Sequence, residues 1–143
     1  MSAFTAITAA NGDASPRVVD VMHRGIVSCT RDASLKSVAE LMAERRVHCV
    51  IVTDDPAAAT ALWGIVSDLD LVAAASVRGL EEQTAGVSAT TPAISIEPQE
   101  SLQRAGYLMI RHWVSHLVVV EPSTRLPIGV ISTLDLATIL AGA

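Results

Sequence analysis

Residues 64–71, Gly-Ile-Val-Ser-Asp-Leu-Asp-Leu, return almost unchanged at residues 129–136 as Gly-Val-Ile-Ser-Thr-Leu-Asp-Leu. In each of these octapeptides a short aliphatic run leads directly into Ser-x-x-Asp. Such a run is typical of a buried strand, and Ser followed by Asp three positions later is typical of a helix start. The sequence therefore predicts the same strand-to-helix junction twice.

The repeat extends upstream of both junctions. Two segments that align after a shift of 67 positions (35 to 102) carry apolar residues at the spacing of one helix face: Leu35, Val38, Leu41 and Met42 in the first, and Leu102, Ala105, Leu108 and Met109 in the second. We interpret aliphatic runs at 47–52 and 114–119 as strands, and likewise shorter runs at 26–29 and 93–96. The chain is thus predicted to be an α/β (α+β) fold in which one β-α-β-β-α unit occurs twice.

A single unit of this size cannot bury both faces of its sheet. We therefore expect the two copies to pack pseudo-symmetrically as one domain. The expected boundaries are a loose segment or an added strand at residues 1–15, a first repeat at 16–77, a linker at 78–91 and a second repeat at 92–143.

The composition excludes several classes of function. Of the 143 residues only 3% are aromatic, and the net charge is −5 without any basic run. These values disfavour nucleic-acid binding and attraction to membrane phosphates. No apolar stretch is long enough to span a bilayer, the N-terminus lacks the features of a signal peptide, and two cysteines are too few for a disulfide scaffold. We expect a cytoplasmic protein.

The two Ser-x-x-Asp elements support two interpretations. A helix N-terminus offers backbone N–H groups to a phosphate, the serine hydroxyl can donate one more hydrogen bond, and the aspartate can accept from the hydroxyls of a ribose. The same residues are also ordinary helix caps. Nucleotide binding and capping are both open at this point.

The stretch from Val18 to Leu140 resembles a pair of cystathionine β-synthase (CBS) domains, known as a Bateman module. The resemblance rests on Asp20-Val21-Met22, Ala39-Glu40-Leu41-Met42, the run at 47–52 and the octapeptides, with their second copies. It implies a regulatory module, often dimeric, that binds an adenosyl ligand such as AMP, ADP, ATP or S-adenosylmethionine in clefts between the repeats.

The resemblance also implies which residues bind the ligand. Asp70 and Asp135 correspond to ribose ligands, and Ser67 and Ser132 to contacts near the phosphate. One cleft would combine Ser132 and Asp135 with His23, Ile26, Val27 and Val47, and the other would combine Ser67 and Asp70 with Thr90, Ala93, Ile94 and Val114. His48 and His116 are further candidates, but they are one position out of step between the copies, so at most one of them faces a cleft. Because the copies differ at these positions, we expect two clefts of unequal affinity or occupancy.

The sequence contains no motif that indicates catalysis or metal binding. It has no nucleophile motif, phosphate-binding loop or Cys-x-x-Cys, so we expect no enzyme, no catalytic cofactor and no protein-bound metal. Apolar helices rich in small residues, at 71–75 and 136–141, favour a homodimer through the helical faces, which would pass a signal to a separate effector protein. Trp113 is expected at that interface or in the core. The alternatives are a dimerisation module with vestigial, empty clefts, and a metal- or redox-responsive protein that uses Cys29 and Cys49.

Overall fold

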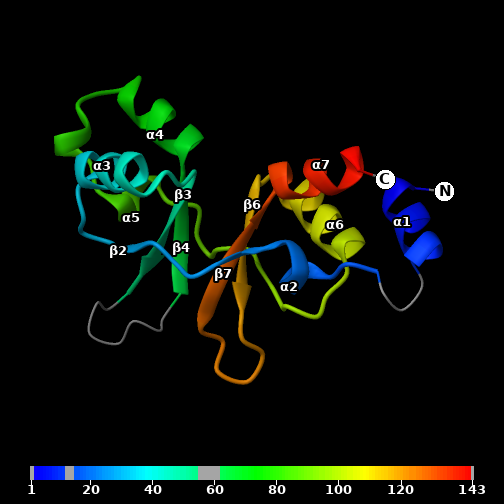
Figure 1. Ribbon diagram of the computed structural model, residues 1–143. Coiled ribbons are helices and arrows are strands. Elements are labelled where there is room, and N and C mark those ends of the chain that lie inside the picture. The colour runs from blue at the N-terminus through cyan, green and yellow to red at the C-terminus, as the bar shows by residue number, and fades with distance from the viewer. Residues whose placement is uncertain (1, 12–14, 55–61, 143) are drawn as a thin grey trace. The chain divides into compact units, whose positions relative to one another are not determined.

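The computed structural model describes residues 2–11, 15–54 and 62–142. They form two compact units, each with its own sheet and helices (Figure 1). Each unit also has its own apolar core. The middle unit is Ile26–Ala93, and the terminal unit combines Met1–Gly25 with Ile94–Ala143. None of the helices in the described part of the chain has the length and apolar character of a membrane span.

The middle unit contains a three-stranded sheet in which β3 is the central strand. Its elements are β2 (Ser28–Thr30), α3 (Leu35–Arg45), β3 (Cys49–Thr53), β4 (Leu62–Ser67), α4 (Asp68–Ala75), the 3-10 helix η2 (Leu80–Glu82) and α5 (Ala85–Ser88). β2 runs parallel to β3, and β4 runs antiparallel to it. Every residue of β3 is buried, and apolar residues of α3 complete an aliphatic core around this strand.

The terminal unit contains a four-stranded sheet in the order β1-β7-β6-β5. Its elements are α1 (Ala3–Asn11), α2 (Val18–Val21), β1 (His23–Arg24), β5 (Ser95–Ile96), α6 (Leu102–His112), β6 (His116–Val120), β7 (Pro127–Ser132) and α7 (Thr133–Ala141). β5 runs parallel to β6, and β6 runs antiparallel to β7. The core again joins one helix face, that of α6, to the buried central strands.

The duplication predicted from the sequence is confirmed. α3 and α6 both have 11 residues, both begin after a serine N-cap, and both end at a residue in the left-handed conformation, Arg46 or Trp113. β4 and β7 both lead directly into a helix at the predicted junctions. The mixed α and β fold is confirmed too, although β2 and β5 begin two residues later than expected (28 against 26, and 95 against 93).

Each unit is completed by a segment that lies outside its own repeat in the sequence. β1 pairs antiparallel with β7, so that His23 lies opposite Val130. In the middle unit Thr90 lies opposite Ile65, and residue 90 corresponds to residue 23 after the same shift of 67 positions (23 to 90). The bounds of the compact units therefore differ from those of the sequence repeats: the middle unit is Ile26–Ala93, whereas the first repeat was expected at 16–77.

Two expectations differ from the structure. The N-terminal segment was expected to be loose or an added strand, but residues 3–11 form α1, because an alanine-rich segment favours a helix and the Phe4 ring packs on Gly106 of α6. Residues 12–14 lie outside the described residues. The core position considered for Trp113 is wrong: this residue is the C-cap of α6, and 92% of it is exposed.

Candidate functional site

Both Ser-x-x-Asp elements form capping boxes. At the start of α4, Ser67 Oγ accepts the N–H of Asp70 at 3.2 Å, and Asp70 Oδ2 accepts the N–H of Ser67 at 2.8 Å. At the start of α7, Ser132 and Asp135 make the same two bonds at the same distances, 3.2 and 2.8 Å. The capping interpretation is therefore confirmed for both helices, and each aspartate keeps one carboxylate oxygen, Oδ1, outside the capping box.

The two junctions differ in what contacts this second oxygen. Asp135 Oδ1 lies 2.8 Å from Nε2 of His23. Among the described residues, no hydrogen-bond donor takes the corresponding place at Oδ1 of Asp70. The Asp135 side chain is only 11% exposed, whereas the His23 side chain is 78% exposed, so the imidazole lies on the solvent side of the carboxylate.

Backbone pairing places residue 23 beside the α7 junction. β1 pairs with the middle of β7, and this close approach requires Gly129, because a Cβ atom there would overlap the carbonyl oxygen of His23. The α4 junction is built in the same way: a Cβ atom on Gly64 would lie 2.7 Å from the carbonyl oxygen of Thr90. Thr90 thus takes the place of His23 at the α4 junction, but with a short side chain.

His48 and His116 occupy different environments. His48 Nδ1 lies 3.1 Å from Asp68 Oδ2 at the exposed start of α4. His116 pairs with Ser132 in the sheet and contacts Ser115, with 2.9 Å between Nδ1 and Oγ. In the middle unit it is Cys49, not His48, that pairs with Ser67. The expectation that the two histidines are out of step is confirmed by this register.

The comparison with known families follows the same repeat. The family model described as "CBS domain" matches residues 18–77 and again residues 85–142. The chain belongs to the CBS domain family. No curated protein matches the chain at a significant level.

Solved structures of CBS proteins share this fold. A CBS domain protein from Pyrobaculum aerophilum, solved in complex with AMP, is 27% identical, with a TM-score of 0.73 over 89% of this chain and 99% of that one. A CBS-domain protein from Agrobacterium tumefaciens is 25% identical, with a TM-score of 0.74 over 85% and 91% of the two chains. The CBS domain pair of protein MJ0100, solved with 5′-methylthioadenosine and S-adenosyl-L-methionine, is 17% identical, with a TM-score of 0.78 over 88% and 96%.

The remaining predicted ligand residues of this CBS pair are divided between the units. Ile26, Val27, Val47 and Ala93 belong to the middle unit, and Ile94 and Val114 to the terminal unit. Val27 and Val47 pack against the core of the middle unit, as Ile94 and Val114 do in the terminal unit. The structure brings His23 to Asp135, whereas the combination of the other residues with the Ser-x-x-Asp junctions stays a prediction.

The cysteines lie in strands and are poor nucleophiles. Burial raises the pKa of Cys49 to about 12, and the nearby Asp68 carboxylate adds to this effect. Burial and Asp32 raise the pKa of Cys29 to about 11. Both thiols are therefore protonated near neutral pH, which disfavours the redox interpretation. Within residues 2–11, 15–54 and 62–142, no group of three or more His, Cys, Asp or Glu side chains could hold a metal ion.

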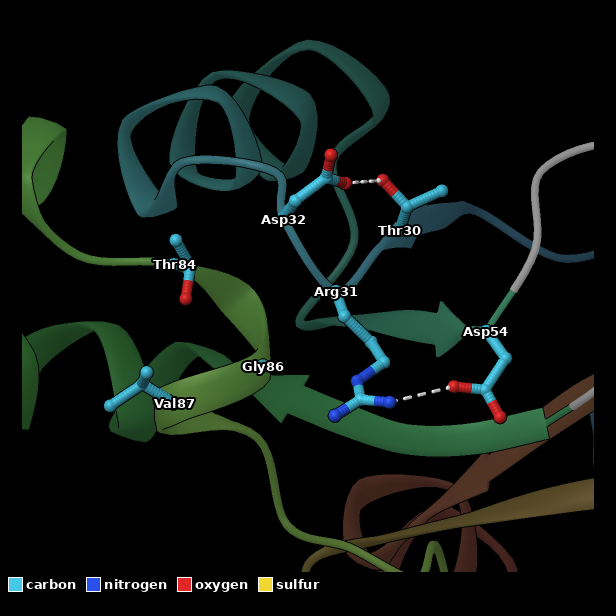
Figure 2. Close-up of a pocket in the computed structure, with 7 residues that line it drawn as sticks. All are labelled: Thr30, Arg31, Asp32, Asp54, Thr84, Gly86 and Val87. Carbon is cyan, nitrogen blue, oxygen red and sulfur yellow. Dashed lines mark hydrogen bonds and ion pairs between the residues drawn. The ribbon is translucent and has the colours of Figure 1, made fainter.

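The middle unit also has a pocket that no sequence pattern predicts. It opens to solvent between the turn after β2 and the start of α5 (Figure 2), and it is lined by Thr30, Arg31, Asp32, Asp54, Thr84, Gly86 and Val87. The Arg31 guanidinium stacks over the Trp63 ring at 4.4 Å, and its Nη1 lies 3.1 Å from Asp54 Oδ1. Because Thr53 pairs with Leu62 whereas Cys49 pairs with Ser67, this pocket lies at the opposite end of β3 from the α4 junction.

Proposed function

We propose that this CBS domain pair is a regulatory, non-catalytic module that binds an adenosyl ligand at its Ser-x-x-Asp junctions and signals to a partner protein. The observation that carries the proposal is the presence of two equivalent junctions, each with a serine hydroxyl and an aspartate carboxylate at a helix N-terminus. The AMP complex of the relative from Pyrobaculum aerophilum supports an adenine nucleotide as the first ligand to test.

The capped geometry is compatible with such a ligand. In each box the serine hydroxyl accepts a backbone N–H, so its own proton is available to a phosphate oxygen. The N-termini of α4 and α7 add the positive end of the helix dipole. The aspartate uses Oδ2 for the cap, which leaves Oδ1 as the acceptor for a ribose hydroxyl.

Ligand binding is tested by calorimetric titration with AMP, with thermal shifts for ADP, ATP and S-adenosylmethionine. Asn retains an amide oxygen for the cap, so the double variant Asp70→Asn, Asp135→Asn should stay folded but lose about tenfold or more in AMP affinity, because hydrogen bonds to a charged group are the stronger ones. Asp20→Asn is the matched control, since Asp20 caps α2 in the same way outside the two junctions. Absence of any binding or stabilisation at millimolar ligand would contradict the proposal.

We also propose that the module forms a homodimer through its helical faces. Leu69 and Leu134 hold equivalent positions in α4 and α7, and they are 72% and 65% exposed. Ile110 and Trp113 add exposed apolar surface at the end of α6. Large apolar side chains exposed on helices are typical of an interface. Light scattering should give twice the chain mass for the wild type and a lower mass for Leu69→Glu with Leu134→Glu. An unchanged mass would contradict this arrangement.

The dimer also bears on the alternative of a purely interacting module. A dimer that binds neither AMP, ADP, ATP nor S-adenosylmethionine would favour a dimerisation module with vestigial, empty clefts. The cytoplasmic location and the effector protein stay predictions of the sequence.

A further inference from the structure

We propose that His23 is a built-in competitor for the ligand at the α7 junction, which makes that junction the weaker and pH-dependent site of the two. The inference rests on the proposed function, because it concerns the regulation of the same Ser-x-x-Asp sites. It assigns His23 a role opposite to that of a ligand-binding residue: the imidazole takes the carboxylate oxygen that the ribose needs.

The contact at Asp135 carries this inference. Oδ2 of Asp135 is held by the N–H of Ser132 at 2.8 Å, and Oδ1 is held by His23 Nε2 at 2.8 Å. Both carboxylate oxygens are thus engaged within the terminal unit itself. A ribose hydroxyl that donates to Oδ1 must therefore displace the imidazole or share the oxygen with it, which weakens the new hydrogen bond.

The environment of His23 makes such a displacement feasible. The backbone of residue 23 is fixed by its pairing with Val130 in β7, but the side chain is 78% exposed. The imidazole can therefore rotate into water, where its polar atoms remain hydrated. His23 acts as a reversible competitor that lowers affinity, and not as a permanent block.

The α4 junction provides an internal comparison. Thr90 pairs with Ile65 as His23 pairs with Val130, and the Ser67–Asp70 capping box has the same dimensions as the Ser132–Asp135 box. A threonine side chain is too short to repeat the imidazole contact, and within the described residues Oδ1 of Asp70 accepts no hydrogen bond. The same ligand should therefore bind more tightly at the α4 junction.

The competition depends on pH because the imidazole is a stronger donor when it is protonated. An imidazolium and a carboxylate form a charge-assisted hydrogen bond, whereas neutral imidazole offers a weaker one. β7 carries no titratable side chain, its neighbours β1 and β6 in the sheet carry Arg24 and His116, and the preceding helix α2 carries Asp20. Asp20 is bound to the N–H of Arg17, and His116 contacts Ser115. Lowering the pH should therefore weaken ligand binding at α7.

Titration calorimetry with AMP in single-site variants tests this inference. Asp70→Asn isolates the α7 junction, and there the additional change His23→Thr copies the residue of the other repeat. We expect this change to tighten AMP binding about two- to fivefold at pH 6, the effect of losing one exposed ion pair, and much less at pH 8. The pH dependence of the AMP phosphate is the same in parent and variant, so it cancels in their ratio.

The reciprocal variant uses the other junction. In the Asp135→Asn background, Thr90→His should install the competitor beside Asp70 and weaken AMP binding at pH 6. Equal or lower affinity after His23→Thr, or an unchanged affinity after Thr90→His, overturns this inference while AMP binding itself persists. Absence of AMP binding in every variant instead overturns the proposed function, and this inference with it.

Discussion

The two glycines of the repeated octapeptides, Gly64 and Gly129, lie against a backbone carbonyl of the neighbouring segment. At Gly64 an added Cβ would lie 2.7 Å from the carbonyl oxygen of Thr90, which also accepts the N–H of Ile65 at 3.0 Å. That oxygen cannot move without loss of the hydrogen bond. We expect Gly64→Ala to lower the free energy of unfolding by about 1–3 kcal/mol, measured by urea denaturation.

Gly142→Ala serves as the control for this substitution. Its Cβ would meet nothing closer than the carbonyl oxygen of Ile139 at 3.8 Å, an ordinary contact. Equal free energies of unfolding for Gly64→Ala and Gly142→Ala would contradict the close approach of Thr90 to β4.

The buried thiols give the fold an alkaline limit. The pKa of Cys49 is raised to about 12 and that of Cys29 to about 11, both from 9.0, so the folded state keeps protons that the unfolded chain has lost. Their contribution to stability is complete below pH 9 and is lost as the pH rises from 9 through 12. Urea titrations at pH 8 and pH 10.5 should show a steeper loss for the wild type than for Cys29→Ala with Cys49→Ala. Parallel losses would show that other groups cause the decline.

At the scale of elements, each of the four longest helices outside the N-terminal segment begins with a serine N-cap: Ser34, Ser67, Ser101 and Ser132. Two of these serines lie at the proposed ligand junctions and two do not. Replacing any of them with alanine should lower the stability by about 1 kcal/mol, because one backbone N–H loses its acceptor.

Ser101→Ala and Ser132→Ala separate capping from ligand binding. Both variants should unfold at lower urea concentrations than the wild type, but only Ser132→Ala should also weaken AMP binding, since its hydroxyl is proposed to contact the phosphate. Thermal unfolding with and without AMP measures both effects. A similar loss of AMP binding in Ser101→Ala would indicate a general effect of stability and remove the special role of Ser132.

Local patterns predicted most of the elements, and the failures have physical causes. The helix periods and the octapeptides are properties of neighbouring residues, so α3, α6 and both junctions were predictable. α1 was missed although its alanine-rich sequence favours a helix, because its place in the fold depends on Phe4 meeting Gly106, a contact between residues far apart in the sequence. The serine–aspartate pairs were identified as site candidates, but the competition at Asp135 depends on the side-chain geometry of His23, which no sequence pattern encodes.

At the scale of the whole molecule, the units of folding and the units of sequence differ. The middle unit needs Gln83, which is buried and whose amide donates to the carbonyl oxygens of Ala74, Arg78 and Gly79. It also needs Thr90, which exchanges two backbone hydrogen bonds with Ile65. Both residues lie beyond residue 77, the end of the first match to the CBS domain.

The fragment 26–93 should therefore be more stable than the fragment 16–77. In the shorter fragment the carbonyl groups at the end of α4 lose the Gln83 amide, and β4 loses its pairing with Thr90. Circular dichroism during urea denaturation should show a cooperative transition for 26–93 and a weaker transition, or none, for 16–77. The fragment 26–93 with Gln83→Ala should have a stability between those of the two unmodified fragments. Greater stability of 16–77 would contradict the division into these compact units.

Because residues 1–25 belong to the terminal unit, the two units are completed at different times during protein synthesis. The ribosome makes the chain from its N-terminus, so the middle unit is complete once residue 93 has emerged. Residues 1–25 are made before the middle unit, yet their partners in α6, β7 and α7 are made after it. His23 must wait for Asp135, which is 112 residues further along the chain. This segment is thus made before the middle unit but is built into the fold only after it, and until then it is exposed to chaperones and proteases.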